Sequence, residues 1–358
     1  MSAQRTLMIM AGGTGGHIFP ALSVAEYVRS HGWNVVWLGS RAGMEARLVP
    51  EKGYTMAWIS FSGLRRRGLL AAALLPLNLL IAFWQSAKAL FAHRPDVVLG
   101  MGGYVAFPGG MMASLFNRPL VIHEQNSVAG LANRVLAQVA DKVLVAFPGA
   151  FGAKSTAQWS GNPVRSDIAS VAAPDARFAG RAGRLRLLVI GGSQGAAALN
   201  EVLPLALAHM DPPMRPELTH QAGSAHFENV QKSYTRAAVS AAVVPFIDDM
   251  ARAYAEADVM ICRAGASTIA ELAAAGVPSV LVPYPYAVDD HQTQNARFLS
   301  ERGAAVLIPQ SELTPEHLAT LLSGFTREKL LAMARAARAA GKPDATRVVA
   351  EACMRLAA

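Results

Sequence analysis

The glycine-rich stretch GGTGGH at residues 12–17 has the clearest chemical signature in the chain. It follows a short apolar run and leads into a helix-like run near Ile18, which predicts a buried strand, a tight loop and a helix start. Backbone N–H groups of such a loop can bind an anion. Two interpretations are open: a phosphate cradle beside a reactive His17, or a structural turn with a surface histidine. The glycines of this first glycine loop are Gly12, Gly13, Gly15 and Gly16.

A second glycine loop, GGSQGA at residues 191–196, follows an apolar run in the second half of the chain. Two further clusters, GMGGY at 100–104 and HEQN at 123–126, follow apolar runs in the first half. Parallel sheets bind ligands outside the carboxyl ends of their strands. We therefore expect these clusters to line ligand sites.

The stretch RAGASTIAELAAAGVPSVLVPYP at 263–285 combines a helix start with a carboxylate. Ser267 can cap the helix that follows Gly265, and Glu271 comes four residues later. Either Glu271 binds ribose hydroxyls of a ligand over the helix end, or it interacts with the helix dipole. The polar run DDHQTQNA at 289–296 also has two interpretations: its side chains contact a ligand, or they cap the helix that follows.

Missing patterns exclude several cofactor classes. The NAD fingerprint needs G-x-G-x-x-G and an acidic residue about 20 residues further on, and neither glycine loop completes it. The P-loop pattern and metal-ligand spacings are absent from the sequence. We therefore expect no cofactor and no bound metal. A diphosphate leaving group would be stabilised by backbone N–H groups, a helix dipole and side chains such as Ser193 and Arg165.

Apolar runs separated by helix-like runs predict an α/β fold with parallel sheets covered on both faces. The predicted strands are 6–10, 34–38, 55–60, 96–101, 120–124 and 142–147, then 185–190, 217–221, 242–247, 258–262, 279–283 and 305–308. The predicted helices are 21–30, 69–92, 106–116 and 129–139, then 197–209, 249–256, 267–275, 291–302, 315–323, 327–340 and 344–357.

A break near residue 164 divides the chain. Gly161, Asn162 and Pro163 mark a turn, and the loop-like stretch 172–184 follows. We predict two doubly wound, Rossmann-like domains that face each other across a cleft, at 1–163 and 164–342. The last helix, about 343–358, is predicted to pack back on the first domain.

Composition restricts the partners. With 358 residues, 52% of them apolar and 16% charged, the chain can bury sizeable cores. Its net charge of +8 favours phosphorylated substrates or an anionic membrane surface, whereas no nucleic-acid-binding motif is found. The distant Cys262 and Cys353 and the absence of a secretory signal predict a reduced, cytosolic protein.

The apolar run 69–84 follows three arginines, Arg65, Arg66 and Arg67. It is shorter than the roughly 20 residues that span a bilayer, and Pro76 interrupts it. Either the segment docks on anionic lipid headgroups, or it forms a buried pair of helices beside solvated arginines.

Taken together, six motifs resemble the MurG family of bacterial glycosyltransferases. They are GGTGGHIFPAL, GMGGY, HEQN, GNPVR, GGSQGA and RAGASTIAELAAAGVP, in this order and at this spacing. The resemblance runs from Leu7 to the C-terminal helices. It implies a GT-B architecture and transfer of GlcNAc, with inversion, from UDP-GlcNAc to the 4-hydroxyl of the MurNAc of undecaprenyl-pyrophosphoryl-MurNAc-pentapeptide (lipid I). The product is lipid II, for peptidoglycan synthesis.

The resemblance also implies roles for single residues in donor binding. Glu271 would hold the ribose hydroxyls, Ser193 the diphosphate and the backbone of Ile247 the uracil edge. Asn126, His291 and Gln292 would contact the sugar. The predicted UDP-GlcNAc set is Thr14, Gly15, Gly16, His17, Asn126, Arg165, Ser193, Gln194, Ile247, Ala266, Ser267, Thr268, Glu271, His291 and Gln292.

On the acceptor side, the resemblance implies that the first-domain glycine loops hold the lipid pyrophosphate. The predicted contacts are Gly13, Gly102, Gly103 and Tyr104. Inversion needs one general base for the acceptor hydroxyl, and a histidine suits that task near neutral pH. His17 is the candidate base, and His123 and Glu124 are its rivals.

The expected partners are UDP-GlcNAc, lipid I, the anionic cytoplasmic face of the bacterial inner membrane and proteins of a cell-wall or division complex. Peripheral docking is predicted through Arg65, Arg66, Arg67, Leu74, Leu75, Leu79, Phe83 and Trp84. Two other functions stay open: a GT-B enzyme with another lipid acceptor such as diacylglycerol, and a non-catalytic lipid- and nucleotide-binding scaffold.

Overall fold

The computed structural model describes residues 4–61, 74–152, 154–192 and 195–357. The chain forms two compact units. Unit 1 consists of Met1–Arg165 with Asp344–Ala358, and unit 2 of Ser166–Pro343.

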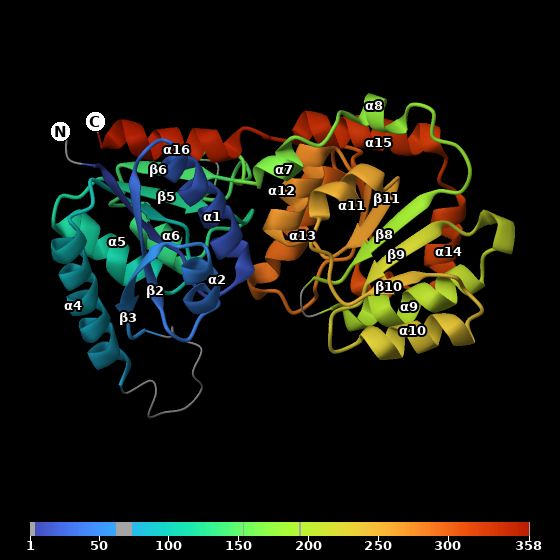
Figure 1. Cartoon of the computed structure of the whole chain (residues 1–358), viewed down its shortest axis with the longest axis horizontal. Coiled ribbons are helices and arrows are strands. Elements are labelled where there is room, and N and C mark those ends of the chain that lie inside the picture. The colour runs from blue at the N-terminus through green and yellow to red at the C-terminus, as the bar shows by residue number, and fades with distance from the viewer. Residues whose placement is uncertain (1–3, 62–73, 153, 193–194, 358) are drawn as a thin grey trace. The chain divides into compact units, whose positions relative to one another are not determined.

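Unit 1 contains a seven-stranded parallel sheet in the order β3-β2-β1-β4-β5-β6-β7 (Figure 1). Its strands are β1 (Thr6–Met10), β2 (Asn34–Ser40), β3 (Thr55–Ile59), β4 (Val97–Gly100), β5 (Leu120–Glu124), β6 (Lys142–Val145) and β7 (Gln158–Trp159). Its helices are α1 (Gly15–Ser30), α2 (Glu45–Glu51), α4 (Leu75–His93), α5 (Ala106–Leu115), α6 (Leu131–Leu136) and α16 (Ala345–Leu356).

Both faces of this sheet are buried, and β1 illustrates why. Successive side chains of a strand point to opposite faces. Leu7 and Ile9 therefore enter the core shared with α1 and α16, while Met8 and Met10 enter the core shared with α4 and α5. A strand buried on both faces must be continuously apolar, which explains the run from Leu7 to Met10.

Unit 2 contains a six-stranded parallel sheet in the order β10-β9-β8-β11-β12-β13 (Figure 1). Its strands are β8 (Arg186–Ile190), β9 (Glu217–Gln221), β10 (Ala242–Val244), β11 (Val259–Cys262), β12 (Ser279–Leu281) and β13 (Ala305–Leu307). Its helices are α7 (Ser166–Ala169), α8 (Pro174–Phe178), α9 (Ala197–Ala208), α10 (Phe227–Arg236), α11 (Met250–Glu256), α12 (Ala266–Ala275), α13 (His291–Ser300), α14 (Pro315–Ser323) and α15 (Arg327–Ala340).

The predicted α/β class and every predicted strand are confirmed, with strand ends within about three residues. Two predictions about where helices lie are wrong. The helix after the first glycine loop begins at Gly15 rather than near Ile18, so α1 starts inside the loop. The stretch 172–184, predicted as a loop, contains α8, because Phe178 and the guanidinium of Arg177 are buried there.

Further short or polar elements were not predicted from the sequence, namely β7, α2, α7 and α10. Helix α10 reads FENVQKSYTR and buries only Val230 and Tyr234. Phe227, Val230 and Tyr234 recur at i, i+3 and i+7, the spacing of one helix face, so the sequence of this polar segment did carry a helical signal.

His220 on β9 is fully buried, and its Nδ1 lies 2.8 Å from the hydroxyl of Tyr234. Burial lowers the pKa of His220 to about 4, whereas an unfolded histidine has a pKa of about 6.5. The unfolded chain therefore binds a proton between these values that the folded chain does not. The free energy of unfolding must fall as the pH decreases through this window, by up to about 3 kcal/mol for one such group.

We expect His220→Asn to reduce this loss of stability, because asparagine does not titrate. The measurement is urea unfolding at pH 7 and pH 5, with the exposed His317→Asn as the matched control. Equal pH dependence in the wild type and in both variants would contradict the assignment.

Candidate active site

The first glycine loop and the GMGGY cluster touch through their backbones in unit 1. They follow β1 and β4, which are paired neighbours in the sheet. Gly103 has a φ of +79°, and a Cβ at this position would lie 2.2 Å from the carbonyl oxygen of Gly12. Only glycine allows this approach, so the two loops form one surface at the carboxyl edge of the sheet.

Glu45 stabilises this surface through hydrogen bonds with backbone N–H groups. It was not predicted as a site residue. Its fully buried carboxylate accepts hydrogen bonds from Gly13 N (3.1 Å) and from the backbone N (3.0 Å) and hydroxyl (3.2 Å) of Ser40. The Ser40 hydroxyl in turn lies 2.7 Å from the Tyr104 hydroxyl. Because the Gly13 N–H donates to Glu45, an anion at this loop must be bound by other groups. In the sequence, Glu45 is marked only as an acidic residue in the first turn of a short helix.

His17 belongs to a chain of hydrogen bonds that includes one of its predicted rivals. His17 Nδ1 lies 2.7 Å from Gln125 Oε1, and Gln125 Nε2 lies 2.9 Å from His123 Nδ1. His123 Nε2 lies 2.9 Å from the carbonyl oxygen of Gly161. His123 is fully buried, and burial lowers its pKa to about 4. His123 is therefore neutral near pH 7, with both ring nitrogens engaged.

The second rival, Glu124, is a buried brace of the loop after β5. One of its oxygens accepts from the backbone N of Asn126 (2.9 Å), and the other from Gly130 N (3.1 Å) and Asn133 Nδ2 (2.9 Å). The Asn126 side chain also donates to Glu124, at 3.4 Å. Glu124 thus orients Asn126, the predicted sugar contact.

In unit 2, α12 begins one residue earlier than predicted. Its N-cap is Gly265, so Ser267 lies in the first turn and is not the cap that we predicted. The first N–H groups of a helix lack intrahelical partners and attract anions. The buried hydroxyl of Ser267 has no hydrogen-bond partner among the described residues. The side chain of Glu271 accepts a hydrogen bond from the Tyr254 hydroxyl at 2.8 Å.

Arg177 anchors the opposite end of α12. Its guanidinium donates to the carbonyl oxygens of Ala275 (3.1 Å) and Gly276 at the end of α12, and to that of Tyr254 (3.1 Å). Burial lowers the pKa of Arg177 to about 10, so it remains charged at neutral pH. A cation at a helix C-terminus stabilises the helix dipole, so Arg177 holds α12 in place through backbone groups.

The polar run after β12 contains residues in unusual backbone conformations. Asp289 and Asp290 have φ values of +53° and +48°, which non-glycine residues seldom adopt. Gln292 Oε1 accepts from the backbone N of Tyr284 (2.9 Å) and Ala264 (3.3 Å), and His291 Nδ1 lies 2.7 Å from Val288 O. These contacts link the start of α13 to the strand ends beside α12.

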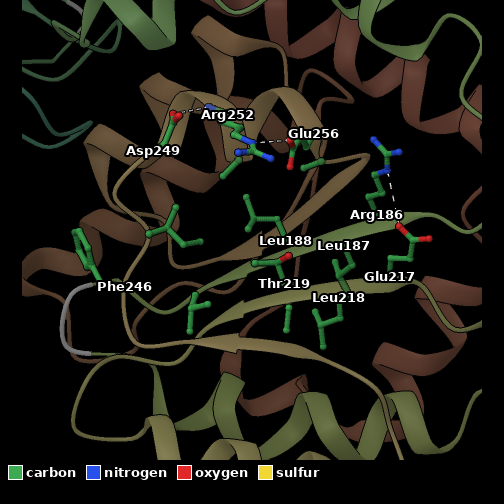
Figure 2. A pocket seen from close by; sticks show the side chains of 15 residues that line it. Arg186, Leu187, Leu188, Glu217, Leu218, Thr219, Phe246, Asp249, Arg252 and Glu256 are labelled. Carbon is green, nitrogen blue, oxygen red and sulfur yellow. Dashed lines mark hydrogen bonds and ion pairs between the residues drawn. The ribbon is translucent and has the colours of Figure 1, made fainter.

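A cavity of about 700 Å³ is lined by residues of β8, β9, β10 and α11 and of the segment between β10 and α11. Figure 2 shows the side chains that line it. Among the described residues of its lining, Ile247 is the only one predicted as a site residue. The lining contains two ion pairs, Arg186–Glu217 (3.9 Å) and Arg252–Glu256 (2.7 Å). Because these charges compensate each other, the cavity has no net basic character.

Helix α4 presents an apolar face to solvent. Leu77, Leu80 and Trp84 are 55%, 66% and 65% exposed, and Leu74 just before the helix is 51% exposed. In contrast, three predicted docking residues turn inward: Leu75 and Leu79 pack against the core, and Phe83 lies 5.9 Å from the Phe107 ring. The exposed stripe, defined as Leu77, Leu80, Ile81 and Trp84, has i, i+3, i+4, i+7 spacing.

Pro76 does not interrupt α4 but lies in its first turn, where the missing N–H removes no hydrogen bond. In the described part of the chain, α4 alone has the length and composition of a possible membrane span, with 22% of its apolar window buried. Its burial against unit 1 and its exposed stripe show an amphipathic helix on the surface of a folded unit.

Other predicted residues lie outside the described ranges: Ser193, Gln194, Arg65, Arg66 and Arg67. Over the described ranges, no group of three or more His, Cys, Asp or Glu side chains is arranged to hold a metal ion.

Comparisons with known proteins first define the class of protein. The N-terminal domain model of glycosyltransferase family 28 matches residues 7–145, and its C-terminal domain model matches residues 186–349. With its two parallel-sheet units, the chain is a family 28 glycosyltransferase with the GT-B fold.

Individual relatives narrow this class. A UDP-N-acetylglucosamine–N-acetylmuramyl-(pentapeptide) pyrophosphoryl-undecaprenol N-acetylglucosamine transferase of Cupriavidus metallidurans is 60% identical over 99% of this chain and 98% of its own length. One of the same name from Burkholderia pseudomallei is 57% identical, over 99% and 97%. The crystal structure of Acinetobacter baumannii MurG is 41% identical and covers 98% of this chain and 99% of its own, with a TM-score of 0.86. The chain therefore belongs to the MurG family.

A more distant structure, the glycotransferase of kitacinnamycin, is 17% identical and covers 99% of both chains, with a TM-score of 0.69. At this identity the likeness shows the fold alone.

We expect Gly103→Ala to destabilise the protein by about 2–4 kcal/mol, because it adds a backbone clash to the strain of a positive φ. Gly32→Ala is the matched control, since Gly32 has a φ of +81° and no atom within 4 Å of a built Cβ. Urea unfolding measures both variants. A Gly103→Ala cost no greater than that of Gly32→Ala would show that the loop contact is not required.

Proposed function

We propose that this protein transfers GlcNAc, with inversion, from UDP-GlcNAc to the 4-hydroxyl of MurNAc in lipid I, and so makes lipid II. The main support for this proposal is that the chain is 60% identical, along almost its whole length, to a relative named for this transfer. Each of the six motifs begins at or just after the carboxyl end of a strand, the edge at which parallel sheets bind ligands. An acceptor of the diacylglycerol type has no such support.

In this proposal unit 2 binds the donor. The free N–H groups of Ala266, Ser267 and Thr268 at the start of α12 stabilise the diphosphate, helped by the unsatisfied Ser267 hydroxyl. Glu271 binds the ribose hydroxyls, and its hydrogen bond from the Tyr254 hydroxyl orients the carboxylate for this task. Arg177 keeps the helix in position from its other end.

The remaining donor contacts follow the family motifs. The Ile247 backbone meets the uracil edge, and Arg165 reaches the nucleotide. Gln292 uses its amide nitrogen for a sugar hydroxyl, since its oxygen accepts from two backbone N–H groups. The other proposed contacts are Thr14, Gly15, Gly16, Asn126, Ser193, Gln194 and His291.

Unit 1 binds the acceptor and supplies the base. As His17 Nε2 takes the proton of the acceptor hydroxyl, that oxygen bonds to the anomeric carbon and the bond to the diphosphate breaks. UDP leaves with the bonding electrons, and the negative charge is stabilised at α12. His17 is favoured over its rivals because His123 is buried with both nitrogens engaged, and Glu124 braces a loop.

The acceptor pyrophosphate is proposed to lie on the joined glycine loops, near Gly13, Gly102, Gly103 and Tyr104. Since Glu45 takes the Gly13 N–H, the glycines serve this site by allowing close approach.

The exposed stripe of α4 supports peripheral docking on an anionic membrane. Trp84 has Lys88 Nζ 5.7 Å from its ring centroid, so a cation and an aromatic ring lie together beside the stripe. This combination is typical of amphipathic helices that lie in the headgroup region of the bilayer. We infer a location at the cytoplasmic face of the cell membrane, where the lipid-linked acceptor is held.

The test is transfer of radiolabelled GlcNAc from UDP-GlcNAc to lipid I in vesicles, with diacylglycerol vesicles as the competing acceptor. We expect lipid I to be glycosylated, and faster when the vesicles contain anionic lipid. No transfer above a heat-inactivated control would exclude the activity, and preferential glycosylation of diacylglycerol would reassign the acceptor.

We expect His17→Ala to lower kcat by about 10²–10⁴-fold, the usual contribution of a general base, and to remove the acid limb of the pH–rate profile. His123→Ala should lower stability and retain that limb, because His123 does not contact the acceptor. Near-normal turnover by His17→Ala with both limbs intact would exclude His17 as the base.

A further inference from the structure

The chain of hydrogen bonds that ends at His17 has a defined direction, because two of its members are backbone carbonyl oxygens that can only accept. One is Gly161 O, 2.9 Å from His123 Nε2. The other is His123 O, 2.9 Å from Gln125 Nε2. Neither residue type nor sequence spacing reveals these contacts.

The first carbonyl determines the tautomer of His123. Because Gly161 O only accepts, His123 Nε2 must carry the hydrogen. In the neutral ring the other nitrogen, Nδ1, then has a lone pair and accepts. Its neighbour at 2.9 Å, the Gln125 side chain, must present its amide nitrogen.

The second carbonyl determines the same orientation of the Gln125 amide independently. The Nε2 group faces His123 O and His123 Nδ1, two acceptors, so Oε1 must face His17. At 2.7 Å from this carbonyl-type oxygen, His17 Nδ1 must be the donor. Neutral His17 therefore has its hydrogen on Nδ1 and its lone pair on Nε2.

We propose that Gln125 is a positioning residue that, backed by His123, holds His17 as the Nδ1–H tautomer and leaves Nε2 to take the proton of the acceptor hydroxyl. This inference rests on the proposed function, in which His17 is the base. Among the described residues, the contact with Gln125 is the only side-chain hydrogen bond of His17, so no other side chain competes for its orientation.

The surroundings keep this arrangement rigid. Gln125 and His123 are 1% and 0% exposed, so water does not replace their hydrogen bonds. The His17 ring also lies against Gly102, where a Cβ would come within 2.9 Å of Nδ1 and 3.0 Å of Cε1. Packing thus determines the ring plane, and Gln125 determines which nitrogen is protonated.

A neutral amide suits this role better than a carboxylate. An adjacent negative charge favours the protonated form of a histidine, and a protonated His17 could not accept a proton. A carboxylate in this position would also repel a pyrophosphate bound nearby. An amide oxygen selects the tautomer without either effect.

The tautomer is measured directly by two-bond ¹H–¹⁵N NMR of the full chain labelled with ¹⁵N-histidine, with His17 assigned from the His17→Gln spectrum. At a pH high enough for the His17 ring to be neutral, we expect a protonated Nδ1 and an unprotonated Nε2. In Gln125→Leu, which keeps the size but removes the amide, the resonances should shift towards a mixture of tautomers. An unchanged Nδ1–H tautomer in Gln125→Leu would overturn the proposal, even if that variant were less stable.

Kinetics provide the second readout. Gln125→Leu should lower kcat about 10–100-fold, part of the contribution of a general base, with a change in KM for UDP-GlcNAc below about threefold. Gln125→Glu should move the acid limb of the kcat profile to higher pH, because a carboxylate favours protonated His17. An unmoved limb in Gln125→Glu would also overturn the proposal.

The assignment of His17 as the base and the proposed role of Gln125 can be disproved independently of each other. If His17→Ala remains fully active while the NMR tautomer follows Gln125, the base assignment is wrong and the hydrogen-bond direction is right. If the wild type transfers GlcNAc but Gln125→Leu keeps its tautomer and kcat, only the role of Gln125 is wrong.

Discussion

The backbone contact between Gly12 and Gly103 is the constraint on which the geometry around His17 depends. It joins the loops after β1 and β4, and a third neighbouring strand, β5, brings the HEQN cluster to the same edge. His17 thereby comes within 2.7 Å of Gln125, although 108 positions separate them in sequence. A side chain at Gly103 would part the loops, because its Cβ would lie 2.2 Å from the carbonyl oxygen of Gly12.

Helix α12 shows a comparable constraint in unit 2. The N–H groups of its first turn lack intrahelical partners, and the buried Arg177 donates to carbonyl oxygens at its other end. Anchoring one end of a helix through backbone carbonyls leaves the other end free to bind an anion without rearrangement. Preorganised dipoles of this kind stabilise developing charge well, because no reorganisation is needed during the reaction.

The polar groups described above in unit 1 form two kinds of hydrogen-bond network. Glu45 and Glu124 accept from loop backbones, so they position loops. The two histidines and Gln125 form a separate chain that contains no carboxylate and ends on a carbonyl oxygen. Carboxylates thus position the loops, whereas an amide and an imidazole make up the chain that reaches His17. This separation keeps negative charge away from the ring proposed as the base.

The sequence by itself determined the α/β class, the parallel sheets and the family, because buried strands must be apolar and the six motifs recur in order. It also pointed to His17 and Glu271 through their places after strands. Tertiary structure decided the rest. The roles of Glu45, Gln125 and Arg177, the position of Ser267 inside α12 and the inward turn of Leu75, Leu79 and Phe83 all depend on contacts between distant segments. Local periodicity cannot report such contacts, since each depends on which strands become neighbours in the folded sheet.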